Sequence, residues 1–272
     1  MRLRNVLAFA AMIALTSAVG CSRLTFVKPK FKNEYHRTAP EYTVRDDPKD
    51  TQRMALLDRV GLAERSFAAG RLDEAETQAR AALKLDPKSA DGYTLLGMIE
   101  GRRGNTTQAG THYAKAAALA PNRGTILNNY GAWLCGNGQA AASLPLFDRA
   151  LADPAYPTPA AVLANAGSCA LTAGQPIRAQ RDLTRALELD PTSAVALAGM
   201  AESEYRAGHF LQARAFSERR LDVAPPSVQV LQLASQIEQK LGDTVAAARY
   251  VQRIGAEFPQ TPAVPSGDAS QP

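Results

Sequence analysis

The stretch ALKLDP at residues 82–87 returns almost unchanged as ALELDP at residues 186–191, and this recurrence decides the fold. Three further segments end in the same way, namely AALAP, LDVAP and GAEFP. The closing prolines are Pro87, Pro121, Pro191, Pro225 and Pro259. Their spacings are 34, 70, 34 and 34 residues, so the gap of 70 holds two repeats and two extra residues near DPAYPTP. A fixed period of this size indicates stacked supersecondary units.

A glycine recurs at one place in every unit when each unit is numbered so that its closing proline is position 32. This is position 15, where a turn between two helices suits a residue that adopts positive φ. The six glycines are Gly70, Gly104, Gly138, Gly174, Gly208 and Gly242.

Small residues recur at three other positions, where two helices must cross closely and a large side chain would push them apart. Position 8 holds Ala63, Gly97, Gly131, Gly167, Ala201 and Ser235. Position 20 holds Ala75, Ala109, Ser143, Ala179, Ala213 and Ala247. Position 27 holds Ala82, Ala116, Ala150 and Ala186, and then departs from the pattern with Arg220 and Ile254.

The period of 34 residues is the length of the tetratricopeptide repeat, a helix-turn-helix unit. We therefore predict an all-α fold, a right-handed superhelix of about six tetratricopeptide units over residues 54–259. A single helix pair cannot bury both of its apolar stripes, whereas stacked pairs bury them against their neighbours and curve around a concave face. The low aromatic content of 6% fits interfaces that Ala and Gly close.

Residues 1–20 have the anatomy of a secretory signal. Arg2 and Arg4 precede ten apolar residues at 6–15, a run too short to span a bilayer. The sequence at 18–21, AVGC, resembles a bacterial lipoprotein cleavage box, which predicts Cys21 as a lipidated first residue of an anchored protein. Ser22 stands where an Asp would favour the inner membrane, so the expected location is the periplasmic face of the outer membrane. An ordinary cleaved signal and an uncleaved anchor are the alternatives.

The segments that flank the repeats are expected to be a lipidated tether at 21–53 and a disordered tail at 260–272. The tether contains RDDPKDTQR at 45–53, a charged stretch that we expect to break helices. Its basic, aromatic front half is either a solvated linker or a contact with lipid headgroups or a partner. Removal of Arg2 and Arg4 with the signal lowers the formal charge from +5 to +3, which gives no case for nucleic acid binding.

Two adjacent asparagines, Asn128 and Asn129, lie off the packing stripe of the third unit, at positions 5 and 6. In tetratricopeptide domains positions 2, 5, 6, 9, 12 and 13 of the first helix line the concave groove. Small side chains and amides there suit an extended peptide, because amides can bond its backbone. The alternative is that the asparagines cap or brace neighbouring helices. The candidate partner-binding residues are Asn128, Asn129, Ala132, Asn165, Ser168 and Tyr205.

Other groove or rim candidates are Met98, Arg102, Glu202 and Arg206, for which ordinary solvated helix surface is the alternative. A known variant of this groove grips a terminal carboxylate with basic residues. Thr94, Val195 and Gly199 stand where those cations belong, so no carboxylate clamp is predicted.

The sequence offers no chemistry-bearing motif. Its histidines, His36, His112 and His209, fall in the tether, a second helix and a turn. No metal-ligand pair, phosphate loop or nucleophile elbow occurs, so we predict no enzymatic activity, no metal and no cofactor. Cys135 and Cys169 are expected to be buried free thiols, with a disulfide as the alternative in an oxidising periplasm.

Four segments of the repeats resemble the PilF/PilW family of type IV pilus biogenesis lipoproteins, as does the two-residue slip between the third and fourth units. They are LNNYGAWL (127–134), FDRALADPAYPTPAAVLANAG (147–167), EYRAGHFLQAR (204–214) and LASQIEQKLGD (233–243). Together with the signal and the tether, the resemblance covers nearly all of the chain beyond residue 20.

The resemblance implies an outer-membrane pilotin that binds the secretin of the pilus machine and helps it reach the membrane and multimerise. It extends to Asn128, Asn129 and Tyr130 as binding candidates, although Tyr130 fits the core better. Two other functions stay open: a lipoprotein adaptor for cell-wall enzymes, and an assembly factor for another pilus system.

Overall fold

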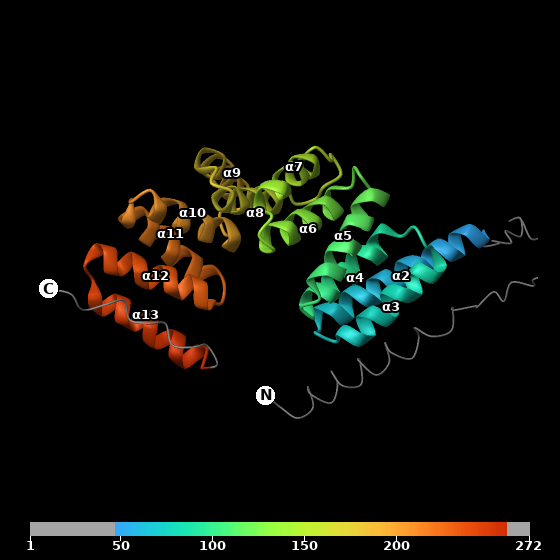
Figure 1. Cartoon of the computed structure of the whole chain (residues 1–272), viewed down its shortest axis with the longest axis horizontal. Helices are drawn as coiled ribbons and strands as arrows, with labels where there is room; N and C mark the ends of the chain where they lie inside the picture. The colour runs from blue at the N-terminus through green and yellow to red at the C-terminus, as the bar shows by residue number, and fades with distance from the viewer. Residues whose placement is uncertain (1–46, 260–272) are drawn as a thin grey trace, which may run out of the picture. The chain divides into compact units, whose positions relative to one another are not determined.

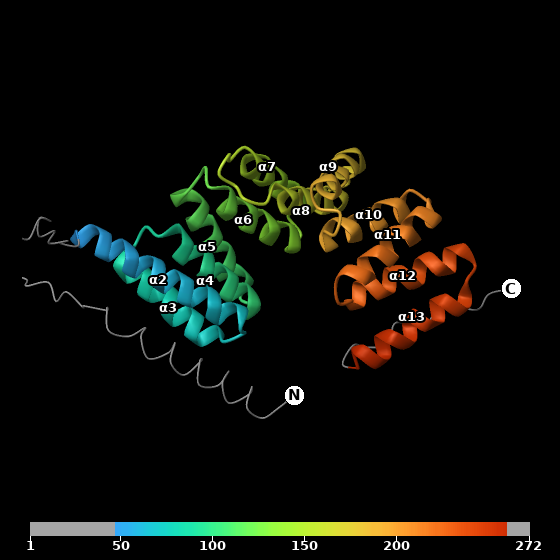
Figure 2. The ribbon, with the colours of Figure 1, turned by 180° about the vertical axis from the view of Figure 1, so that it is seen from behind.

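The computed structural model describes residues 47–259, which form twelve α-helices and no strand. Figure 1 shows these helices, and Figure 2 shows them from behind. The helices are α2 (Pro48–Ala68), α3 (Leu72–Leu85), α4 (Ala90–Arg102), α5 (Thr106–Leu119), α6 (Gly124–Gly136), α7 (Ala140–Leu151), α8 (Pro159–Thr172), α9 (Pro176–Leu189), α10 (Ala194–Arg206), α11 (Phe210–Val223), α12 (Val228–Leu241) and α13 (Thr244–Glu257). The predicted all-α repeat superhelix of six helix pairs is confirmed.

The helices pack in a regular order. Each even-numbered helix packs against the odd-numbered helix that follows it, and that helix contacts the start of the next pair. The first helices of the pairs also contact one another in series, from α2 through α4, α6, α8 and α10 to α12. The second helices α3 to α13 make no such contacts within the described residues. The first helices therefore form one continuous surface.

The turn inside each pair follows the predicted glycine pattern. All six glycines at position 15 have positive φ, between 72° and 83°. At Gly138 the nitrogen also donates a hydrogen bond to the Cys135 carbonyl at the end of α6. Since L-residues rarely adopt this backbone conformation, each glycine reverses the chain at a place where other residues would be strained.

The helix crossings are closed by the small residues at positions 8 and 20. At Gly167 an added Cβ would lie 2.6 Å from Leu183 Cγ and 3.0 Å from the Leu183 nitrogen, so the two backbones meet. All six residues at position 20 are buried. Of the two exceptions at position 27, Ile254 is buried, whereas Arg220 donates to the carbonyls of Ala224 and Pro225 after its own helix.

The start of the first helix differs from the prediction. The stretch RDDPKDTQR does not separate a tether from the repeats at residue 53, because α2 begins at Pro48. Asp47 is the N-cap, and its carboxylate accepts from the Lys49 nitrogen at 2.9 Å. Proline at the first helical position lacks only an N–H that the helix leaves unpaired, so Asp47 and Pro48 begin a helix here.

The two extra residues between the third and fourth units build a loop that returns to the start of α6. Asp153 Oδ2 accepts from the Gly124 nitrogen at 2.7 Å, and Oδ1 accepts from the Ala155 nitrogen at 2.9 Å. These bonds to N–H groups lower the pKa of Asp153. Tyr156 packs so closely on Gly124 that a Cβ there would lie 2.6 Å from its ring. The insertion thus fixes the entry to α6.

Several predictions lie outside the described residues: the signal at 1–20, lipidation of Cys21, the tether up to residue 46 with His36, and the tail at 260–272. Within residues 47–259, no helix has both the length and the apolar composition needed to cross a membrane.

Candidate functional site: the joint between the third and fourth units

Asn128, one of the two adjacent asparagines predicted to line a groove, joins two helices through a hydrogen bond with Asn165. Asn165 Nδ2 on α8 donates to Asn128 Oδ1 on α6 at 3.0 Å, and both side chains are half-buried. If both amides are flipped, the bond remains and its direction reverses, so that Asn128 donates to Asn165. Asn128 and Asn165 therefore brace neighbouring first helices, which is the alternative raised from the sequence.

The free-thiol prediction for Cys135 and Cys169 is wrong, because the two residues form a disulfide between α6 and α8. Their Cα atoms lie 5.8 Å apart, which is the usual spacing for such a bond. They occupy positions 12 and 10 of their units, and these unequal positions gave no sign that the two residues are close. Their separation of 34 residues, however, is one repeat length. The covalent bond and the amide pair hold the same two helices.

The remaining candidates of these two units give a shallow surface of small side chains. Asn129 is half-buried, and its amide has no hydrogen-bond partner among residues 47–259. Ala132 is exposed, and half-buried Ser168 lies where α10 approaches, since a Cβ on Gly199 would be 3.0 Å from its Oγ. We call Asn129, Ala132 and Ser168 the joint surface. It offers one free amide and one hydroxyl on a rigid base.

The rim candidates are largely engaged with their neighbours. The Arg102 guanidinium lies 5.0 Å from the centre of the Phe67 ring, and Tyr205 lies against Phe210 at 5.7 Å between ring centres. Arg206 Nε donates to Glu202 Oε1 at 2.6 Å. These contacts fit a structured helix surface, and binding by Tyr205, Arg102, Glu202 or Arg206 stays a prediction. Met98 is half-buried.

An aromatic cluster beside the joint was not predicted as a unit. Tyr113 of α5 lies 6.3 Å from Tyr130 and 5.9 Å from Trp133 of α6, between ring centres. Gly110 makes room for the indole, since a Cβ there would lie 2.5 Å from Trp133 Cη2. Burial raises the pKa of Tyr113 to about 12, so its hydroxyl stays neutral. Tyr130 is half-buried in this cluster, where it acts as a packing residue.

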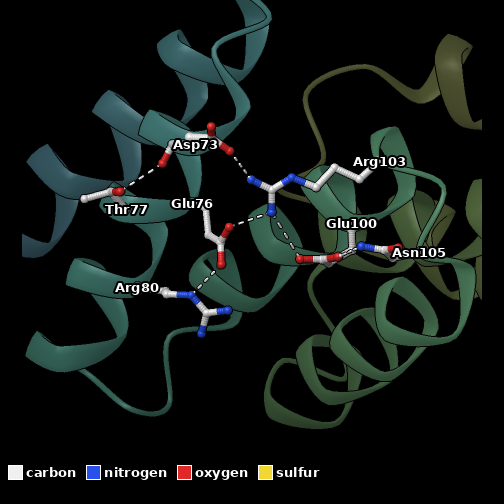
Figure 3. A network of polar contacts seen from close by, with 7 residues as sticks. All are labelled: Asp73, Glu76, Thr77, Arg80, Glu100, Arg103 and Asn105. Carbon is white, nitrogen blue, oxygen red and sulfur yellow. Dashed lines mark hydrogen bonds and ion pairs between the residues drawn. The ribbon is translucent and has the colours of Figure 1, made fainter.

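A charged network ties the first unit to the second (Figure 3). Arg103, in the turn after α4, donates to Asp73 and Glu76 of α3, each at 2.5 Å, and more weakly to Glu100. Glu100 is buried, and it also accepts from Asn105 Nδ2 at 2.6 Å. The hydrogen bond from Arg103 is the main cause that lowers the pKa of Glu76, and a second comes from Arg80. No periodic signal marks this network in the sequence.

The described residues contain no group of three or more His, Cys, Asp or Glu side chains placed to hold a metal ion. Some of their acidic groups take part in contacts between helices, such as Glu238 of α12 with Arg214 of α11. The first helices form a surface that presents amides, a hydroxyl and short apolar side chains in a fixed array. That arrangement fits recognition of another polypeptide.

Comparison with known proteins places the repeats in the tetratricopeptide class. A tetratricopeptide repeat model matches residues 170–237. The type IV pilus assembly protein PilF of Pseudomonas aeruginosa is 28% identical over 145 residues, which span 53% of this chain and 56% of PilF. The chain is thus aligned with little more than half the length of that curated relative.

Solved structures extend the match over the repeats. The crystal structure of PilW, a widely conserved type IV pilus biogenesis factor, has a TM-score of 0.67 and 30% identity, covering 76% of this chain and 94% of that one. A structure of Pseudomonas aeruginosa PilF has a TM-score of 0.66 at 23% identity, covering 78% and 95%.

The fold and the surface of the first helices define a tetratricopeptide repeat protein, a class that typically serves as a non-catalytic module for protein interaction. The identity to PilW over nearly its whole length is more specific. The chain belongs to the PilF/PilW family of type IV pilus biogenesis proteins.

Proposed function

We propose that the chain is a non-catalytic, lipid-anchored pilotin. It binds the secretin of a type IV pilus and promotes the localisation and multimerisation of that secretin in the outer membrane. In this proposal the acyl chain on Cys21 supplies the membrane address, and the stacked helices supply the grip on the secretin subunit. The observation that carries the proposal is the match to PilW over 94% of that protein at 30% identity.

The joint surface is the proposed place of contact. Asn129 and Ser168 offer hydrogen-bonding groups beside the exposed Ala132, and the disulfide and the amide pair hold α6 and α8 beneath them. A fixed base lowers the ordering entropy lost on binding, so a shallow surface of small residues can still bind an extended segment.

The decisive experiment is deletion of the gene followed by analysis of the secretin in outer-membrane fractions. We expect heat-stable secretin multimers to be lost and to return with the wild-type gene. Persistence of the multimers in the deletion strain would refute the pilotin role. If the multimers persist and a cell-wall hydrolase co-purifies with this protein from wild-type cells, the adaptor function is favoured instead.

Two variants then separate the anchor from the grip. Cys21→Ser is expected to leave the helical domain folded and to mislocalise the secretin. Ala132→Arg places a long cation on the joint surface and should abolish multimers, while Ala142→Arg, at an exposed site on α7 of the same unit, should not. Normal secretin in the Cys21→Ser strain would disprove the anchor role, and equal behaviour of the two arginine variants would exclude the joint surface.

A further inference from the structure

Position 18, the second residue of the second helix, differs in chemistry between the two halves of the repeat array. In the first three units it is Asp73, Thr107 and Ala141. In the last three it is Ile177, Leu211 and Val245, and these side chains are 88%, 66% and 69% exposed. Asp73 accepts a hydrogen bond from Arg103 (Figure 3), so the same position serves packing between units at one end of the array.

Ile177 lies at the edge of a hollow. This hollow, of about 830 Å³, lies between the turn that begins α9 and the end of α10. The walls are mainly apolar and include Leu171, Pro176, Ile177 and Ala207. We call it the turn hollow. Its size and lining fall in the range of sites that take up a ligand group, and an isolated exposed aliphatic residue needs no such concavity.

The polar residues around the turn hollow are Gln180, Ser203 and two arginines, with no carboxylate among the lining residues. Arg181 uses Nε and Nη2 on Asp182, and Arg206 uses Nε on Glu202 and Nη1 on the Leu171 carbonyl. Each guanidinium therefore keeps N–H donors that no described residue takes up. Those donors complement an acceptor with negative charge that arrives with the apolar group.

We propose that the turn hollow is a docking site for a partner protein whose segment presents an aliphatic or aromatic side chain beside a carboxylate. The apolar side chain enters between Ile177 and Ala207, and the carboxylate accepts from Arg181 and Arg206. The site is separate from the joint surface, and the proposal does not depend on whether the partner is the secretin.

Two other occupants fit the observations less well. A lipid surface can cover Ile177, Leu211 and Val245, but it cannot fill a concavity in the protein surface. A second copy of this chain could bring acidic residues such as Asp73, but that contact joins two different surfaces. Contacts of that kind continue into open filaments unless a ring closes.

In-cell photo-crosslinking tests the proposal on the full chain. A benzophenone amino acid replaces Ile177, and matched controls carry it in place of Thr107 or Val245, at the same register. We expect light-dependent adducts at 177 only, and mass spectrometry should identify a protein segment in which an apolar residue adjoins an Asp or Glu. If the probe at 177 unfolds the chain, the same probe in place of exposed Gln180 serves instead.

Arg181→Gln, introduced beside the probe at 177, tests the charge. It should lower the adduct yield about fivefold, whereas Arg185→Gln, one turn further along α9, should leave it unchanged. Lipid adducts, adducts to this chain itself, segments without the paired chemistry, or a yield no higher than at position 107 would each overturn the proposal. Adducts to the predicted type of segment on a protein other than the secretin would support this site, and the secretin proposal would still be decided by the deletion experiment.

Discussion

Two joints between neighbouring units have the same scaffold but different fastenings. The joint of the first and second units is tied by Arg103, which contacts Asp73, Glu76 and Glu100. The joint of the third and fourth units is tied by the disulfide of Cys135 with Cys169 and by an amide pair. Small residues close the helix crossings of all four units alike.

The difference teaches that the repeat pattern sets where helices cross, while non-repeating residues set what each joint responds to. A charge network weakens when carboxylates are protonated, and its exposed members are screened by salt. A disulfide is broken by a reductant, and the constraint that it places on the unfolded chain does not depend on the protonation of carboxylates. The two joints should therefore fail under different conditions.

Loss of the disulfide is expected to have the largest effect. Serine at both Cys135 and Cys169 should lower the free energy of unfolding by about 3 to 4 kcal/mol, because the bond closes a loop of roughly one repeat. Urea unfolding followed by circular dichroism measures it, with Cys21→Ser in both proteins so that no third thiol interferes. The oxidised background should respond to dithiothreitol, and the double serine variant should not. Identical urea midpoints for the two proteins would contradict the prediction.

Overpacking at a helix crossing should have the next largest effect on the free energy of unfolding. The loss should differ between Gly167 in the fourth unit and Gly97 in the second. Gly167→Ala forces a Cβ against Leu183 Cγ and the Leu183 nitrogen, and we expect a net loss of about 2 kcal/mol. In Gly97→Ala the atoms nearest to the new Cβ are side-chain atoms of the Tyr113 ring, at 3.0 Å. There the gain in helix propensity of about 1 kcal/mol offsets most of the strain. Urea midpoints of the two variants measure the contrast, and an equal loss at both sites would show that backbone contact is not what distinguishes them.

Removal of Arg103, which links the carboxylates of the charge network, is expected to cost less than loss of the disulfide or Gly167→Ala. Arg103→Gln leaves Glu100 buried with Asn105 as its remaining partner, so the free energy of unfolding should fall by about 1 to 2 kcal/mol at neutral pH. Arg102→Gln is the matched control: its guanidinium only lies over Phe67, and about 0.5 kcal/mol is expected. Equal losses in Arg103→Gln and Arg102→Gln would mean that the effect comes from removal of one positive charge and not from the contacts of Arg103.

The same pair of proteins has a pH signature with a definite sign. Arg103 lowers the pKa of Glu76 below its ordinary value of 4.5, so this stabilisation is fully present above that value. It is lost as the pH falls through the lower pKa of the folded protein. The difference between wild type and Arg103→Gln should thus shrink below about pH 4.5. Burial lowers the pKa of His112, which also disfavours the folded state in acid, but it does so in both proteins. A difference that stays constant down to about pH 3 would refute the assignment.

The fold was accessible from the sequence because its determinants recur every 34 residues. Gly138 and Gly167 each have five counterparts at the same register, so backbone reversal and close crossing could be inferred without any contact being seen. The start of α2 was missed because it occurs once: Asp47 and Pro48 have no counterpart in the other units. A charged, proline-containing stretch at the edge of a repeat array begins a helix as readily as it breaks one.

The candidate site was only partly accessible, for the same reason. Register placed Asn128 and Asn165 on one surface, but it could not show that their amides bond each other rather than a partner. It also misjudged Cys135 and Cys169, since their positions differ by two while the helices that carry them lie side by side. Contacts across units depend on how α6 and α8 lie against each other, which no single unit encodes.

The smallest expected effect separates the bracing asparagines from the one left free. Asn165→Ala and Asn128→Ala should each lower the free energy of unfolding by about 1 kcal/mol, and the double variant should lose little more than either, because one hydrogen bond accounts for both. Additive losses would mean that the two amides act separately. Asn129→Ala, adjacent on α6, is the control: it should leave stability nearly unchanged yet reduce secretin multimers, whereas Asn165→Ala should show the reverse. If Asn129→Ala alters stability and spares the multimers, Asn129 is a third brace and the joint surface loses its only free amide.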